Sequence, residues 1–208
     1  MGREENIDIF QDTEKLCKNN NKLRNAIRNS KEKQRLILET DKVFKKFEKE
    51  GTPEKRYEEK ANVVVSKKRS YEAASGYKGK QICVHNFASA TNPGGGVVNG
   101  SSAQEECLCR CSTLYFNLNT ADMWEKFYIP HREARNPIHN DDCIYTPEVV
   151  VMKTDTAWPE LMAKEDWYLV NVITCAAPNL RLVPSNHMNM GDGFEAVKMT
   201  DKDLLVLH

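Results

Sequence analysis

The chain has 208 residues, of which 40% are hydrophobic and 29% charged, and its 30 Lys and Arg balance its 30 Asp and Glu. This length suffices to bury a sizeable core without disulfides or metals, and a formal charge of zero argues against a general nucleic-acid coat. The longest purely apolar runs fall far short of the roughly 20 residues that span a bilayer, and the charged N-terminus is unlike a secretion signal. We therefore expect a cytoplasmic protein with no membrane segment and no direct nucleic-acid partner.

The balanced charge is unevenly distributed along the chain. Residues 1–70 carry 19 Lys and Arg against 13 Asp and Glu, whereas residues 71–208 carry 11 against 17. The first part is also poor in Gly and Pro, while the second holds eight of the ten Gly and seven of the eight Pro. We therefore expect a helical N-terminal extension over residues 1–60 and an α/β domain over residues 61–208.

Apolar residues in the N-terminal part recur at spacings of seven and four, which is the pattern of an amphipathic helix. This pattern predicts two helices, the first opening at residues 12–14 and interrupted at residues 19–21, where three Asn favour caps over helix interior. Their basic faces could contact a polyanion, but interleaved Glu makes a solvated surface the simpler interpretation. The residues that carry the pattern are Leu16, Leu23, Ile27, Leu36, Val43 and Phe47.

After a break at residues 51–53, apolar and β-branched runs predict strands at 62–66, 81–87, 144–145, 149–152 and 168–174. Helical patterns lie between some of them, at 70–74, 103–116 and 121–127. Strands that alternate with helices imply an α/β layered domain with a largely buried sheet. A final helix is predicted at 200–208, where a good N-cap is followed by only about two turns, so we expect a domain cut short.

Cysteine and histidine give no prediction of a metal site. Seven cysteines are an odd number, and without a secretion signal we expect reduced thiols. Cys107, Cys109 and Cys111 lack the paired spacing of zinc sites, and the five histidines show no ligand spacing. Trp124 and its neighbours at 127–128 have helical spacing, which favours core packing over adenine stacking.

The most unusual segment, residues 86–106, joins the end of a predicted strand to the start of a predicted helix. Gly94, Gly95 and Gly96 remove every Cβ from one turn, so a ligand can approach the backbone closely. Several N–H groups can then face anionic oxygens such as those of a diphosphate. The spacing differs from that of the dinucleotide fingerprint and of the P-loop.

The helix that follows is predicted to open with a capping box, in which Ser102 is the N-cap and Glu105 reaches back. Glu105 and Glu106 then lie in the first turn, about 100° apart around the helix axis, so one can face a ligand while the other caps or binds hydroxyls. A turn or a helix start is commonplace alone, but the two together are specific. The predicted core-facing residues of this helix are Cys107, Leu108, Cys111 and Leu114.

These residues resemble the signature of poly(ADP-ribose) glycohydrolases: Gly94-Gly95-Gly96, seven intervening residues, then Gln104-Glu105-Glu106. The longer sequence of residues 86–96 is similar to that of the microbial branch of the family. The same holds for residues 107–115, 141–147 and 173–179 and for the helical N-terminal region. The resemblance implies a macrodomain-like fold, a three-layer mixed sheet flanked by helices, with an N-terminal helical extension. It also implies a hydrolase that cleaves the ribose–ribose O-glycosidic bond of poly(ADP-ribose) on modified proteins, without a cofactor or metal.

The resemblance assigns roles to the site residues. It implies that Glu106 is the acid/base that protonates the leaving ribose oxygen and later deprotonates water, and that Glu105 holds ribose hydroxyls. It further implies a set of residues that bind the ADP-ribose beside Glu106. These are Asn92, Gly94, Gly95, Gly96, Val97 and Gln104.

Two alternatives stay open beside the enzyme: a non-catalytic module that binds ADP-ribose, and an inactive truncated homologue. Family members continue past the helix at 200–208 with a strand and a glycine- and phenylalanine-containing loop, and nothing in the chain matches these. We therefore expect the C-terminal part of the domain to be missing, and the sequence predicts no oligomeric state.

Overall fold

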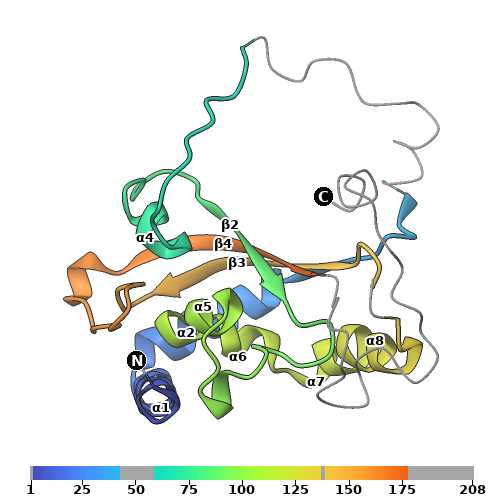
Figure 1. The fold of residues 1–208 in the computed structure, drawn as a ribbon, viewed down its shortest axis with the longest axis horizontal. Coiled ribbons are helices and arrows are strands. Elements are labelled where there is room, and N and C mark those ends of the chain that lie inside the picture. The colour runs from blue at the N-terminus through green and yellow to red at the C-terminus, as the bar shows by residue number, and fades with distance from the viewer. Residues whose placement is uncertain (1, 43–58, 137–138, 178–208) are drawn as a thin grey trace.

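The computed structural model describes residues 2–42, 59–136 and 139–177 (Figure 1). Four strands of this part form one mixed sheet in the order β1-β3-β4-β2. They are β1 (Arg35–Ile37), β2 (Cys83–Ala88), β3 (Cys143–Val151) and β4 (Tyr168–Ala176). β4 pairs in parallel with β2 and antiparallel with β3, and β3 pairs antiparallel with β1. The predicted α/β class with a mixed sheet is therefore confirmed.

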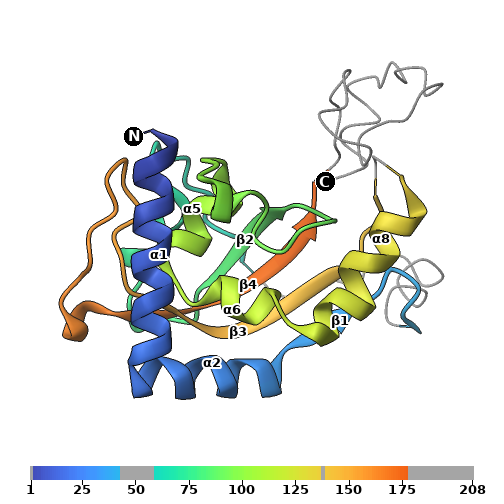
Figure 2. The same ribbon diagram turned by 90° about the horizontal axis from the view of Figure 1, so that it is seen from below.

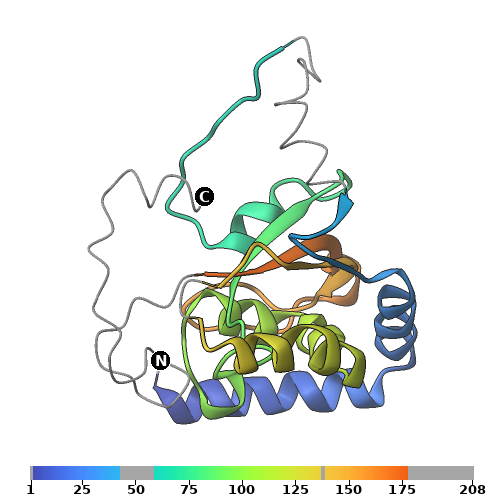
Figure 3. The same cartoon turned by 90° about the vertical axis from the view of Figure 1, so that its right-hand side faces the viewer.

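Most helices cover one face of this sheet. α1 (Arg3–Asn19) and α2 (Asn21–Lys33) precede it, and α5 (Gln104–Cys111), α6 (Leu114–Leu118), α7 (Ala121–Met123) and α8 (Ile129–Ala134) connect β2 to β3. A π-helical turn (Trp124–Tyr128) joins α7 to α8, and 3-10 turns lie at η1 (Val97–Asn99) and η3 (Lys164–Asp166). α4 (Ser70–Ser75) packs beside β2 and α5. Figures 2 and 3 show α1 as the outermost layer on this face, with α5 and α6 between it and the sheet, whereas α4 lies outside this stack.

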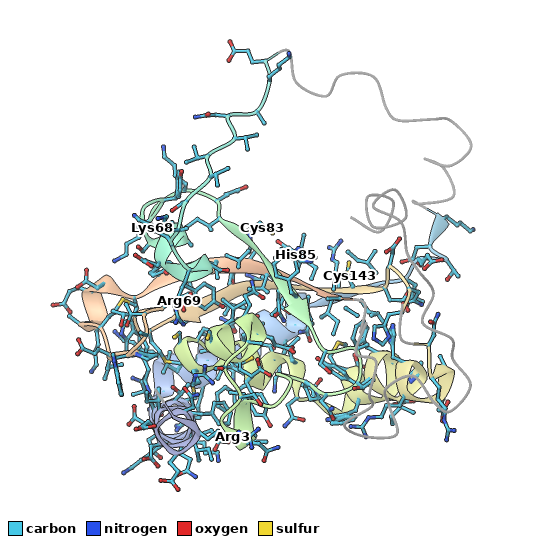
Figure 4. All side chains as sticks on the ribbon, viewed as in Figure 1. Arg3, Lys68, Arg69, Cys83, His85 and Cys143 are labelled. Carbon is cyan, nitrogen blue, oxygen red and sulfur yellow. The ribbon has the colours of Figure 1, made fainter. Side chains whose placement is uncertain are left out.

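The core lies between the sheet and these helices. Alternate residues of β2 are buried, and those between them, such as Cys83 and His85, are exposed on the opposite face (Figure 4). α1 contributes to the same core, because Phe10 is buried and its ring packs edge-on against Tyr115 with centroids 5.0 Å apart. Burying such a ring contributes about 1.5–3 kcal/mol. The N-terminal helices thus pack on the domain, while the predicted division at residue 60 stays a prediction. None of the described helices is long and apolar enough to cross a membrane.

α1 begins earlier than predicted, at Arg3 instead of residues 12–14. The Glu5 carboxylate accepts a hydrogen bond from Gly2 N (2.6 Å) and so caps the helix there. Asp12 and Thr13 lie in mid-helix and bind the rest of the domain. Asp12 pairs with the Lys153 ammonium (2.7 Å), and Thr13 Oγ1 donates to Arg110 O (2.6 Å). The polar residues that the sequence pattern indicated as a helix start therefore hold the middle of α1 against the rest of the domain.

The predicted interruption of the N-terminal helices is confirmed. The Asn20 side chain accepts hydrogen bonds from Lys22 N and Leu23 N and caps α2. The helical pattern was wrong at Leu36, which lies on β1, because a run of three residues pairs with β3 there. Several predictions lie outside the described residues: Val43, Phe47, the break at 51–53, His187, His208 and the helix at 200–208.

The predicted strand at 62–66 is wrong. Val63, Val64 and Val65 are 67–94% exposed, and they pair with no strand within the described ranges. Figure 1 shows this segment running away from the sheet. A β-branched run indicates only that its residues would fit a packed strand. Here no described strand lies beside the run to pair with it. The predicted strands at 81–87 and 168–174 are confirmed as β2 and β4.

Three other elements differ in extent from the prediction. The strands predicted at 144–145 and 149–152 are a single strand, β3, since a bulge between Thr146 and Val149 shifts its register without ending it. The helix predicted at 103–116 is two helices, because Ser112 is extended and bridges Val151. The pattern at 121–127 continues to Ala134. The helix predicted at 70–74 is confirmed as α4.

α1 also contacts the segment that precedes α5. The buried Asn6 side chain donates from Nδ2 to Gly100 O (2.9 Å). Gly100 has a φ of 74°, and a Cβ there would collide with the backbone of Arg3, which lies beside this segment (Figure 4). The start of α1 therefore fixes the chain between the glycine run and α5.

Asn6→Ala tests this contact. We expect the free energy of unfolding to fall by about 1–2 kcal/mol, because the Gly100 carbonyl would lose its buried donor. Urea unfolding of the protein measures the change, with Asn29→Ala on the exposed side of α2 as the matched control. Equal stability of the two variants would show that the contact contributes nothing.

Candidate active site

The candidate site lies where β2 ends and the chain turns back toward α5. We call residues 89–96 the glycine loop. Within it and just after it, Gly95 N donates to Asn92 O (3.0 Å) and Val97 N donates to Gly94 O (3.1 Å). Gly94 and Gly95 have φ angles of 69° and 57°, which L side chains rarely adopt. The predicted glycine turn is therefore present, as two tight turns that face the first turn of α5.

Glu106 lies against this loop and is buried. Its Oε1 accepts a hydrogen bond from Gly96 N (2.9 Å), and its Oε2 is buried with no partner within the described residues. A Cβ on Gly95 would lie 2.5 Å from Oε1, so only glycine permits this approach. One oxygen of the carboxyl group is thus fixed, and the other is left for a ligand or a proton.

Glu105 is equally buried but faces the end of β2. Its Oε2 accepts from Ser89 N (2.8 Å) and its Oε1 accepts from Asn86 Nδ2 (3.4 Å). Burial raises the pKa of Glu105 to about 8, although these two donors oppose the shift, and the charge of Glu106 adds to it. The Glu105 carboxyl group is therefore largely neutral at pH 7.

The predicted capping box is wrong. Ala103 is the N-cap of α5, and no side chain caps it. Glu105 cannot reach back to Ser102, because its carboxyl group is held by donors at the end of β2. The predicted core-facing residues Leu108, Cys111 and Leu114 are confirmed as fully buried, but the prediction was wrong at Cys107. Cys109 is fully buried with Leu108 and Cys111, whereas Cys107 is only half-buried.

Gln104 joins α5 to the edge of the sheet. Its Oε1 accepts from Phe87 N (2.9 Å), and its Nε2 donates to His85 O (2.7 Å) and to Ser70 Oγ (3.1 Å). The amide group therefore pairs with β2 as a neighbouring strand would. A substrate contact of Gln104 stays a prediction.

The backbone N–H groups in and just after the glycine run already have hydrogen-bond acceptors within the protein. The N–H groups of Gly95, Gly96 and Val97 all donate within the loop or to Glu106. The absence of Cβ atoms thus serves the approach of the two carboxyl groups. The expected contacts of Gly94 to Val97 with a diphosphate stay predictions.

Asn92 is held by a residue that the sequence analysis missed. Its Oδ1 accepts from Arg132 Nη2, and Arg132 Nε also donates to Thr91 O (2.8 Å). Asn86 and Ser89, the donors to Glu105, were missed as well. They lie eight and five residues before Gly94 and could have been found as polar residues at a strand end, whereas nothing local marks Arg132.

The remaining candidates have structural surroundings. Phe127 and Tyr128 are fully buried, which confirms core packing, while the half-buried Trp124 stacks on the Arg132 guanidinium at 4.6 Å from its ring centroid. All seven cysteines are free thiols. No group of three metal-ligating side chains occurs in the part of the chain that the structure describes.

Comparisons of the sequence with family models and of the structure with solved structures agree on one family. A model of the microbial-type PARG catalytic domain matches residues 3–154. The chain is similar to poly(ADP-ribose) glycohydrolase from Thermomonospora curvata, with 28% identity, a TM-score of 0.72, and coverage of 87% of this chain and 69% of that one. For the same protein bound to the inhibitor ADP-HPD, the values are 28%, 0.68, 88% and 66%. No curated protein matches the chain.

The poly(ADP-ribose) glycohydrolase from Deinococcus radiodurans in complex with ADP-ribose is also similar. It shares 28% identity and a TM-score of 0.61, over 74% of this chain and 59% of that one. The chain thus spans about two thirds of the length of the first relative and less of the second.

Gly95→Ala tests the approach of the carboxyl groups. We expect it to lower the free energy of unfolding by about 1–3 kcal/mol more than Gly79→Ala, because it would separate the buried Glu106 from Gly96 N. Gly79 is a matched control, since its φ is 83° and nothing lies within 4 Å of an added Cβ. Urea unfolding compares the two, and equal losses would mean that only backbone strain matters.

Glu105→Gln tests the burial of a carboxyl group whose pKa is raised from 4.5 to about 8. The folded protein binds this proton more tightly than the unfolded chain, so the stability it contributes is complete below about pH 4.5 and is lost as the pH rises through about 8. The amide has no such loss. We expect the melting temperature of the variant, relative to the original protein, to rise by a few degrees between about pH 5 and about pH 9.

The control for this series is Glu133→Gln, which removes an exposed carboxylate of α8. Its melting temperature should follow that of the original protein at every pH. A constant difference between Glu105→Gln and the original protein would contradict the raised pKa of Glu105.

Proposed function

Because the chain belongs to the microbial-type poly(ADP-ribose) glycohydrolase family, whose catalytic-domain model matches most of it, we propose that it binds ADP-ribose units and hydrolyses the ribose–ribose O-glycosidic bond of poly(ADP-ribose). The solved relatives that contain ADP-ribose or ADP-HPD support this choice of ligand. The observation that carries the proposal is the Glu106 carboxyl group, buried with one oxygen fixed by Gly96 N and the other unpartnered.

In the proposed reaction, Glu106 Oε2 transfers a proton to the leaving ribose oxygen as the glycosidic C–O bond breaks. The anomeric carbon becomes an oxocarbenium ion, and one water molecule adds to it. Glu106 Oε2 then takes the proton that this water gives up, so the carboxyl group ends as it began. A single residue can serve as acid and then as base because giving up the proton leaves the carboxylate that later accepts one, while Gly96 N holds its other oxygen in place.

Glu105 has a separate proposed role. Its pKa of about 8, raised by burial, keeps it neutral near pH 7, so it places no negative charge beside Glu106. A neutral carboxyl group both donates and accepts hydrogen bonds. This suits the ribose hydroxyls, which also do both.

The glycine loop is proposed to lie along the ADP-ribose. The lack of Cβ atoms at Gly94 to Gly96 lets the backbone of this loop lie directly against both carboxyl groups, with Val97 buried beside it. Asn92 is proposed to contact a ribose. Gln104 is proposed to act by holding α5, the helix that carries Glu105 and Glu106, against β2. Modified proteins would carry the polymer.

The decisive variant is Glu106→Gln. We expect kcat for the release of ADP-ribose from a poly(ADP-ribosyl)ated protein to fall about 10²- to 10⁴-fold, because the amide cannot give or take the proton. ADP-ribose affinity, measured by calorimetry, should change only a few-fold. Glu105→Gln is the matched control and should raise KM more than it lowers kcat, since it alters hydroxyl contacts.

Other outcomes separate the alternatives. Full activity of Glu106→Gln would disprove its role as acid/base. Binding of ADP-ribose by the original protein without any release from polymer would instead favour a non-catalytic binding module. An unchanged melting temperature with ADP-ribose, and no activity, would favour an inactive homologue.

A further inference from the structure

We propose that Arg132 of α8 is a positioning residue of the site, which holds the glycine loop in the shape that Glu106 requires. The guanidinium group donates from Nε to Thr91 O (2.8 Å) and from Nη2 to Asn92 Oδ1. These two acceptors are adjacent in the chain, so the planar group binds the loop at two points. Hydrogen bonds from an ionised donor are roughly twice as strong as neutral ones.

The contact is linked to the reacting group by two further hydrogen bonds. Asn92 O accepts from Gly95 N (3.0 Å), which closes the turn, and the next N–H, that of Gly96, donates to Glu106 Oε1 (2.9 Å). Moving residues 91–92 would therefore move the donor that fixes Glu106. Arg132 acts on the carboxyl group through the loop, without touching it.

The guanidinium group is itself held from behind. The Trp124 ring stacks on it, and Trp124 Nε1 donates to Asn119 Oδ1 (2.8 Å). Asn119 Nδ2 donates in turn to the Tyr115 hydroxyl (3.0 Å), and the Tyr115 ring lies against Gly94, where an added Cβ would come within 2.7 Å. This chain of contacts returns to the glycine loop. The loop is thus contacted at two places, by Arg132 before the glycine run and by Tyr115 at its first glycine.

Within the described ranges, the contacts of the Arg132 guanidinium group are to uncharged groups. Its partners there are a carbonyl, an amide and an indole ring, and it forms no ion pair with the residues that the structure describes. A positive charge therefore stands beside the loop. Under the proposed function, on which this step rests, the charge would also attract the diphosphate of ADP-ribose.

Lysine cannot replace arginine in this arrangement. An ammonium group keeps the charge, but it has neither the planar fork that reaches two acceptors nor the flat face that stacks on Trp124. Arg132→Lys therefore separates geometry from charge, and Arg132→Met removes both. Arg135→Met is the matched control, because Arg135 is an exposed arginine at the end of the same helix.

Hydrogen–deuterium exchange of the peptide 89–100 is the primary measurement, since it needs no substrate. We expect exchange to rise at least about fivefold in Arg132→Met and in Arg132→Lys, and to stay unchanged in Arg135→Met. Trp124→Leu, which keeps both hydrogen bonds of Arg132, should give a smaller rise and serves if Arg132→Met fails to fold. Exchange equal to that of Arg135→Met, or full rescue by lysine, would overturn the proposal.

Binding and turnover give the functional readout. Calorimetry should show about tenfold weaker ADP-ribose binding in Arg132→Met, a smaller loss in Arg132→Lys, and a fall in kcat in both, because Glu106 loses its fixed donor. An original protein that does not bind ADP-ribose would count against the proposed function alone, since the exchange experiment would still decide the role of Arg132. Unchanged kcat together with raised exchange would show that the loop does not position Glu106, and would overturn that step.

Discussion

Two adjacent carboxyl groups are buried in the first turn of one helix, and the rest of the site depends on providing them with donors. Glu105 and Glu106 are only 3% and 6% exposed. A buried polar group without partners is costly, so each carboxyl group needs hydrogen bonds from groups that are themselves fixed. Ser89 N and Gly96 N supply them from the two ends of one loop. The glycine run follows from this need, because a side chain on Gly95 would occupy the place of the Glu106 carboxyl group.

The same need gives the loop hydrogen-bond partners from within the protein itself. The N–H groups of Gly95, Gly96 and the following Val97 already donate hydrogen bonds, and the carbonyl of Gly100, just after the loop, is bound by Asn6 of α1. Preorganised groups cost no rearrangement when the reaction occurs. The helices that flank the sheet thus contribute to the chemistry through the backbone of a loop that they hold.

Local signals in the sequence predicted the elements and the carboxyl pair. β2, β4, α4, the cap at Asn20 and the glycine turns each have a pattern within a few residues, and the structure confirms them. Predictions failed where a distant partner competes with a local one. Glu105 looked like half of a capping box, but donors at the end of β2 bind it. The contacts of Asn6 with Gly100 and of Arg132 with Thr91 join residues 94 and 41 positions apart, so no spacing rule reveals them.

Gln104 fixes the rotational phase of α5. By pairing with Phe87 N and His85 O it locks the first residue of the helix to a particular register of β2. Each following residue is then turned by about 100° about the helix axis, so the directions of Glu105 and Glu106 are set as one unit. A change in this phase would turn both carboxyl groups together, the first away from Ser89 and the second away from Gly96. The amide group of Gln104 therefore makes the directions of the Glu105 and Glu106 side chains depend on where α5 is attached along β2.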